Sequence, residues 1–281
     1  MDIANINAAL SAAGFGQRAG EIAQLARPAI RMQATPSTAP VQPSGASRLG
    51  GQPDLPGVAW PDKDGASLAF IAQIRLEDVA SLDTEHLLPP SGWLSFFYDA
   101  QQQTFGDNPS DRAGWKVLYF PPDAKMSDSI VPSDVPQNAR YKPCALTFAS
   151  ELTVPLQPNL ERPKLAWSPT DEKAYEGFLS SVQGAPGNTT PRHHLLGYPD
   201  TIQDDMRMQC QLMSHGVTDP SDPKAAGLQA GANDWILLLQ VDSDERIGMR
   251  WGSAGMLYYW IEREDLANKR FDNVWVVLQS D

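Results

Sequence analysis

The apolar run DWILLLQV (234–241), followed by GMLYYWI (255–261) and VWVVLQ (274–279), decides the fold. These runs are rich in β-branched and aromatic residues, which favour strands. A similar series comes earlier in the chain, as FIAQI (70–74), GWLSFF (92–97) and WKVLY (115–119). The two series together predict a β-rich body.

One glutamine, one glycine and one tryptophan recur in the same order in the two series. The matched pairs are Gln73 and Gln240, Gly92 and Gly255, and Trp115 and Trp275. The shift within a pair falls from 167 to 163 to 160 residues, as small changes in loop length would produce. Apolar strands can also look alike by chance, but ordered self-similarity usually reports repeated architecture. We therefore expect two superposable halves, with 48–150 and 151–281 as their possible limits.

Helical patterns flank this body. Apolar residues recur at helical spacing over 3–13 and 17–27, and Ser168 with Pro169 begins a predicted helix over 168–182. Strands and helices do not alternate as βαβ units, so the predicted class is α+β: a β-rich body of two pseudo-repeated halves with peripheral helices. Residues 1–47 are predicted to form two short helices, a strand and a Pro/Ser-rich linker, ahead of a main domain over 48–281.

Composition limits the function. The net charge of −12 argues against binding to nucleic acid or to an anionic membrane surface; it allows a basic protein partner, but it favours simple solubility. Two cysteines, Cys144 and Cys210, form no disulfide framework. With no signal-peptide pattern and no apolar run of membrane-spanning length, the sequence predicts a cytoplasmic protein.

The segment HHLLGYPDTIQ (193–203) invites a chemical interpretation. The adjacent residues His193 and His194 cannot both face one metal ion from a regular strand or helix, so we predict no metal site. WGSAG (251–255) is no nucleophile elbow, because Trp251 stands where that motif needs glycine. The sequence contains no phosphate loop or dinucleotide fingerprint, and we predict no cofactor.

Three rigid loops, 48–61, 193–203 and 251–255, are rich in glycine, proline or both. We expect them to converge on one concave face, because stiff loops on a scaffold often carry function. The residues predicted to line that face are Arg48, His193, His194, Tyr198, Gln203 and Trp251. Arg48 would offer a planar donor fork to an anionic group. The alternative is that each loop only caps its own end of the sheet.

The sequence from Arg48 to the C-terminus resembles the YwqG-like family of bacterial proteins. The resemblance rests on LGGQPDLP, LAFIAQI, LPPSGWLSFFYD, HHLLGYPDTIQ, DWILLLQVDSD, WGSAGMLYYWI and FDNVWVVLQ. It implies a soluble α+β protein and no activity, since the function of that family is unknown. The family often has lysine where Arg48 stands, and aspartate where Ser253 stands.

Two functions from different classes follow from these observations. The first is a non-catalytic binding module: an adaptor, inhibitor or immunity-type protein that recognises a basic partner by charge complementarity. The second is an enzyme or small-ligand binder with a site in the cleft between the two halves. A deep pocket with convergent polar groups would favour the second.

Overall fold

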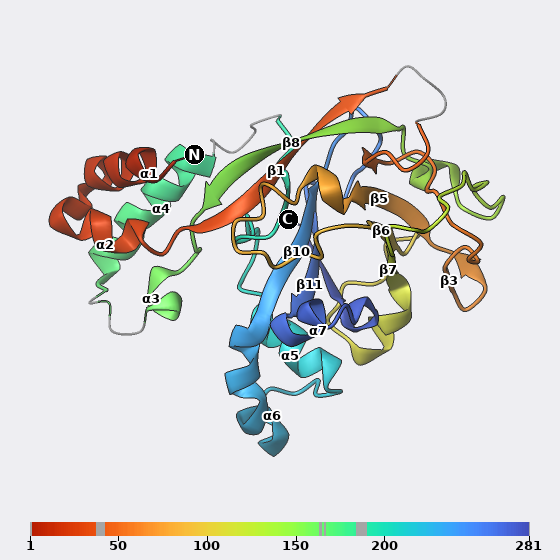
Figure 1. The fold of residues 1–281 in the computed structure, drawn as a ribbon. Coiled ribbons are helices and arrows are strands. Elements are labelled where there is room, and N and C mark those ends of the chain that lie inside the picture. The colour runs from red at the N-terminus through yellow and green to blue at the C-terminus, as the bar shows by residue number, and fades with distance from the viewer. Residues whose placement is uncertain (1, 38–42, 163–164, 166, 184–189, 281) are drawn as a thin grey trace.

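The fold is a single large antiparallel sheet with helices at its ends (Figure 1). A computed structural model describes residues 2–37, 43–162, 165, 167–183 and 190–280. The sheet contains β1 (Arg27–Pro36), β2 (Arg48–Leu49), β5 (Ala69–Arg75), β6 (Trp93–Tyr98), β7 (Trp115–Phe120), β8 (Cys144–Thr153), β9 (His193–Leu195), β10 (Trp235–Asp242), β11 (Met256–Glu262) and β12 (Trp275–Gln279). A small separate hairpin is made by β3 (Asp62–Lys63) and β4 (Ala66–Ser67).

The helices lie around this sheet. They are α1 (Ile3–Leu10), α2 (Ala19–Ala23), α3 (Pro158–Glu161), α4 (Pro169–Gln183), α5 (Arg207–Ser214), α6 (Pro223–Leu228) and α7 (Arg263–Ala267). Short 3₁₀ or π turns are η1 (Ser11–Phe15), η2 (Gly16–Arg18), η3 (Leu76–Asp78), η4 (Pro109–Gly114), η5 (Gln137–Ala139), η6 (Gln229–Asp234) and η7 (Phe271–Asn273). The predicted α+β class, β-rich with peripheral helices, is confirmed. Within the described ranges, no helix is both long and apolar enough to span a membrane.

The strand order shows a duplication. Across the sheet the order is β12-β11-β10-β9-β1-β8-β2-β5-β6-β7, which reads equivalently from both ends. In chain order the first repeat is β1, β2, β5, β6 and β7, and the second is β8 to β12. The first strand of each repeat lies beside the second strand of the other, since β1 pairs with β9 and β8 pairs with β2. The two repeats are therefore intertwined by an exchange of their first strands.

The register of β1 and β8 fixes the axis that relates the repeats. Ile30 pairs with Ser150, and Pro36 pairs with Cys144. Arg31 of β1 pairs with His194 of β9. Ala145 of β8, the counterpart of Arg31, pairs with Arg48 of β2. Both sets of pairings are consistent with a pseudo-twofold axis between Gln33 and Thr147, which pair with each other.

Local details repeat as well. The register of β5 on β6 shifts between Phe70 and Ala72, and that of β10 on β11 shifts between Leu237 and Leu239. Both bulges stand at the same distance from the matched glutamines Gln73 and Gln240. The tryptophan match is one residue out of register. Trp260 and Phe97 are equivalent, and they pair with Trp275 in β12 and with Lys116 in β7, so Trp275 corresponds to Lys116 and not to Trp115. The matched strands are equivalent, while the two tryptophans are not at the same position on them.

The outer strands β7 and β12 meet and nearly close the sheet. The indole Nε1–H of Trp115 donates to the carbonyl of Val274 (2.8 Å), and that of Trp275 donates to the carbonyl of Gly106 (2.9 Å). The two indole rings pack edge to face with centroids 5.0 Å apart. This reciprocal contact covers edges that would otherwise expose unpaired backbone groups.

The N-terminal helices pack on α4 and away from the centre of the sheet (Figure 1). Phe15 stacks on Trp167 and meets Tyr175 of α4 edge to face. The helix predicted to begin at Ser168 with Pro169 does form there, and Ser168 and Asp171 form a reciprocal cap at the start of α4. By contrast β1 is a central strand of the sheet, between β9 and β8. Residues 38–42 of the predicted linker lie outside the described residues.

The closure depends on the absence of a side chain at Gly106, which has φ +78°. An added Cβ would overlap the carbonyl oxygen of Val276. We expect Gly106→Ala to lower the free energy of unfolding by about 3 kcal/mol, from left-handed strain plus overpacking. Gly65→Ala is the matched control, because Gly65 has φ +84° with nothing within 4 Å of its Cβ position. If urea denaturation shows that both variants lose the same free energy of unfolding, the close contact between Gly106 and Val276 at the seam is contradicted.

Candidate functional site

Two predicted site residues, Arg48 and His194, occupy equivalent places in the repeats, and both are buried. Each belongs to what we call a Gln–Asp knot. In the first knot, Gln73 accepts the backbone N–H of Asp54 (2.8 Å) and donates to Asp54 Oδ2 (2.8 Å) and to the carbonyl of Ala46 (3.0 Å). Arg48 then donates to the same Asp54 Oδ2 (2.9 Å). Arg48 is thus a structural ion-pair partner, only 2% exposed.

The second knot has the same hydrogen-bond pattern. Gln240 accepts the backbone N–H of Asp200 (2.7 Å) and donates to Asp200 Oδ2 (2.9 Å) and to the carbonyl of Arg192 (2.8 Å). His194 stands where the first knot has Arg48, and its Nε2 lies 3.9 Å from Asp200 Oδ2. Its Nδ1–H donates to the carbonyl of Leu196 (2.9 Å). Arg192 supplies the positive charge here, through its ion pair with Asp200.

His193 replaces a hydroxyl of the first repeat. Ser47 accepts the backbone N–H of Arg75, and His193 Nδ1 accepts the equivalent N–H of Asp242 (3.0 Å). This bond places the imidazole proton on Nε2, which faces Asp244 Oδ2 at 3.8 Å. His193 is therefore a buried positioning group.

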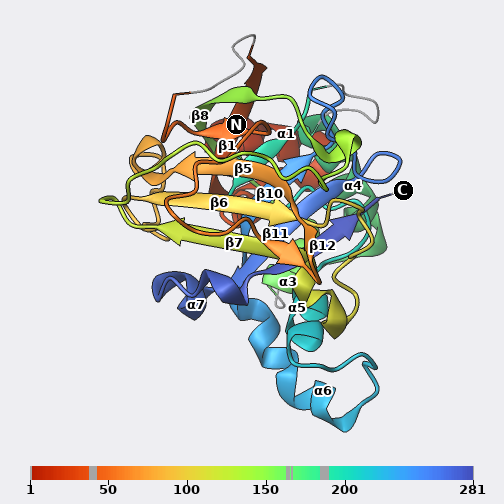
Figure 2. The same ribbon diagram turned by 90° about the vertical axis from the view of Figure 1, so that its right-hand side faces the viewer.

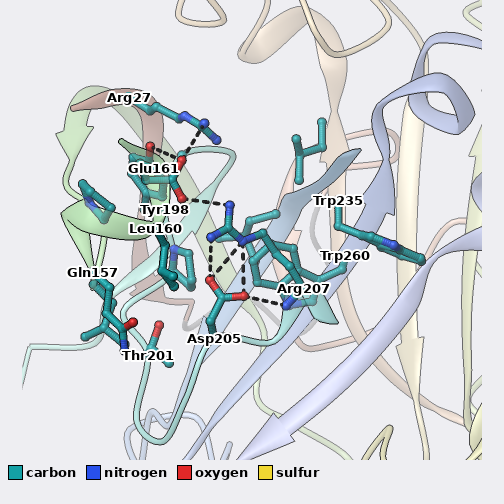
Figure 3. A pocket seen from close by; sticks show the side chains of 16 residues that line it. Arg27, Gln157, Leu160, Glu161, Tyr198, Thr201, Asp205, Arg207, Trp235 and Trp260 are labelled. Carbon is teal, nitrogen blue, oxygen red and sulfur yellow. Dashed lines mark hydrogen bonds and ion pairs between the residues drawn. The ribbon is translucent and has the colours of Figure 1, made fainter. Parts of the chain in front are cut away.

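Tyr198 lines a different cavity, the Tyr198 pocket (Figure 3). Glu161 of α3 lies between Arg27 and Arg207, and it also accepts the Tyr198 hydroxyl (3.1 Å). Asp205 pairs with Arg207 from the other side (2.8 Å). The free volume of about 30 Å³ holds about one water molecule. We read this pocket as an ion-pair network that fastens α3 to the body.

The remaining predicted residues lie elsewhere. Trp251 is enclosed and packs edge to face on Tyr98 and Tyr141. Gln203 donates to the carbonyl of Ser280 (2.8 Å). The six predicted side chains thus do not line one cavity: Tyr198 lines the Tyr198 pocket, and His193 lines a second hollow near the pseudo-twofold axis.

That second hollow, which we call the axial hollow, has a volume of about 460 Å³. Its charged lining is Arg31, Arg192, Arg246 and His193. Ala145, Ala46 and Ser47 stand at the equivalent positions on the other side of the axis, in place of Arg31, Arg192 and His193. The guanidinium set is thus specific to one side of the axis. Each arginine of this hollow already has an acidic partner: Arg31 pairs with Glu151, Arg192 with Asp200, and Arg246 with Asp244.

A third cavity lies where the two edges of the sheet meet, and we call it the seam pocket. Its volume is about 350 Å³, within the range of small-ligand sites. It is lined by Arg112, Ser214, His215, Trp235, Glu262, Asp265, Arg270, Asn273 and Trp275. Arg112 comes from the first repeat and the other residues come from the second, so both repeats contribute.

Arg112 differs from the arginines of the axial hollow. It forms no hydrogen bond or ion pair with any residue in the described parts of the chain, and its guanidinium lies over the Trp115 ring at 5.9 Å. Burial lowers the pKa of Arg112, and Asp272 opposes this effect. A half-buried guanidinium without an anionic partner is costly to maintain. No pattern in the sequence singled out Arg112 or Glu262.

Nothing in the described residues suggests metal or thiol chemistry. They contain no group of three or more His, Cys, Asp or Glu side chains that could hold a metal ion. Burial raises the pKa of the Cys144 thiol to about 11, and it raises that of Cys210 as well. Neither thiol is therefore activated as a thiolate.

A family profile described as a domain of unknown function, DUF1963, matches residues 47–280. The chain belongs to this family. A comparison with curated proteins finds no match.

The Gln–Asp knots predict a matched pair of effects. Gln73→Ala and Gln240→Ala should each lower the free energy of unfolding by about 3 kcal/mol, because each leaves buried partners unsatisfied. Gln33→Ala, at an exposed site on the pseudo-twofold axis, should change it by less than about 0.5 kcal/mol. Urea denaturation measures all three. A large difference between the two knot variants would contradict their equivalence.

His194 predicts a pH dependence. Burial lowers the pKa of His194 below its ordinary value of 6.5. The unfolded chain then binds a proton that the folded chain does not, so the free energy of unfolding falls as pH drops below about 6.5. Denaturation between pH 8 and pH 5 should show a shallower fall for His194→Gln than for the parent chain. The exposed His86, changed to Asn, should leave the slope unchanged; an unaltered slope in His194→Gln would refute this assignment.

Proposed function

We propose that this protein is a small-ligand-binding module whose site is the seam pocket between its two repeats. The observation that supports the proposal is Arg112, which lines the pocket from the first repeat and forms no hydrogen bond or ion pair with the described residues. Binding sites commonly keep such groups at a cost to stability. An anionic group of a ligand would complete the environment of Arg112.

Binding fits the seam pocket better than catalysis. Ser214 and His215 lie together there, with Oγ and Nδ1 3.1 Å apart, and they resemble a nucleophile and its base. However, Nδ1 also lies 2.8 Å from the carbonyl of Gln211, to which it must donate a proton. Ser214 donates to the same carbonyl (3.2 Å). Nδ1 therefore cannot accept the serine proton, and the pair ends helix α5 without activating a nucleophile.

The small-ligand alternative from the sequence thus has more support than the basic-partner alternative. A basic protein partner rests on the net charge alone and stays a prediction, as do the cytoplasmic location and the narrower YwqG-like resemblance. The axial hollow is a weaker candidate than the seam pocket, because each of its three arginines is paired with a carboxylate.

The variant Arg112→Gln tests the proposal. Thermal unfolding would be followed with a panel of small carboxylates, amines and phosphates at millimolar concentration. Some members should raise the Tm of the parent chain by several degrees, because a ligand that binds only the folded state stabilises it. Arg112→Gln should lose this shift while its ligand-free Tm stays equal or rises, since an unpaired half-buried charge is removed.

The matched control is Arg250→Gln, at an exposed arginine that forms no ion pair within the described ranges. It should retain the ligand-induced shift. The proposal fails if no panel member raises the Tm of the parent chain, or if Arg112→Gln responds as fully as Arg250→Gln does.

A further inference from the structure

The seam pocket contains a second unpaired charge, of opposite sign. Glu262 lines the same pocket as Arg112, and its carboxylate forms no hydrogen bond or ion pair with any described residue. Burial and the neighbouring Asp265 raise the pKa of Glu262, as expected for a carboxylate that lacks a cation. A carboxylate and a guanidinium thus line one pocket, and their oxygen and nitrogen atoms are not within 4.0 Å of each other.

The fold keeps these two groups apart. Arg112 belongs to η4 of the first repeat and lies over the Trp115 ring. Glu262 is the last residue of β11 and pairs with Trp235 across the sheet. Both are attached to elements at the seam, whose positions the Trp115–Trp275 contact fixes. Both groups therefore line the seam pocket from elements whose positions the scaffold fixes.

The other charged groups of the pocket are already compensated. Asp265 pairs with Arg270 (2.6 Å), and Arg270 also pairs with Glu264 (3.0 Å). His215 donates through Nδ1 to the carbonyl of Gln211. Arg112 and Glu262 are therefore the two charged groups of the lining that form no hydrogen bond or ion pair with the described residues.

We propose that the seam pocket binds a small zwitterion of the amino-acid class, with its carboxylate on Arg112 and its ammonium group on Glu262. This inference rests on the function proposed above. A simple anion would leave Glu262 unpaired, and a simple cation would leave Arg112 unpaired; a zwitterion satisfies both with charge-assisted hydrogen bonds. Trp235 and Trp275 also line the pocket, although both are almost completely buried.

A series of ω-amino acids of increasing length tests this inference and measures the distance between the two charges. Glycine, β-alanine, 4-aminobutyrate and 5-aminopentanoate would be titrated against the full chain by calorimetry, together with the α-amino acids. One chain length should bind best, because only one spacing can reach both Arg112 and Glu262. The N-acetyl and the carboxamide derivatives of the best ligand each lack one charge, and each should bind at least about tenfold more weakly.

Variants separate the two contacts. Glu262→Gln should weaken binding of the zwitterion at least about tenfold and leave binding of its N-acetyl derivative unchanged. Arg112→Gln should weaken binding of the zwitterion by as much and leave binding of its carboxamide derivative unchanged. Glu176→Gln, at an exposed glutamate of α4, is the matched control and should change nothing. Equal binding of the N-acetyl derivative and the parent zwitterion would overturn the inference. If only carboxylates without an ammonium group bind, and Arg112→Gln abolishes that binding, the zwitterion is wrong while the ligand-binding function stands.

Discussion

The reciprocal hydrogen bonds of Trp115 and Trp275 hold together the two outer strands of the sheet. Each indole donates to a backbone carbonyl at the opposite edge, and the rings pack on each other. A ten-stranded open sheet would expose two edges, which are sites for unwanted pairing. The contact between the two edges covers them and brings η4 of the first repeat against the second repeat, where the seam pocket lies. In the view of Figure 2, β5, β6 and β7 run side by side beneath β8, with α5 and α6 below the sheet.

The duplication separates framework from specialised residues. The hydrogen bonds between glutamine and aspartate are the same in both repeats, so these residues belong to the common structural framework. Where the repeats differ, one of them carries chemistry that the other lacks. Trp93 donates to the carbonyl of Gly45 in the first repeat, and its ring lies beside Gly45. The two repeats therefore share one scaffold and differ in the side chains that it carries.

Much of the sheet could be predicted from the sequence, because its strands are apolar runs with recognisable landmarks. The repeated glutamine marked equivalent strands correctly, since its amide holds a buried turn in each repeat. The exchange of β1 and β8 could not be predicted, because strand partners depend on long-range register. The predicted loop residues were prominent in the sequence because they are framework: Arg48 and His194 are buried in the knots. Arg112 was missed because an isolated charged residue in a short turn has no pattern.

Hydrogen exchange of the tryptophan indole groups tests the closure of the sheet most directly. Trp115 and Trp275 are almost completely buried, and each indole N–H is bonded across the seam. If the two contacts form one closing unit, their indole protons should exchange with the same opening free energy, close to that of global unfolding. Trp167, which is partly exposed at the helical end, should exchange much faster. Fast or unequal exchange at Trp115 and Trp275 would show that the edges open independently, and the seam pocket would then not be a fixed feature of the fold.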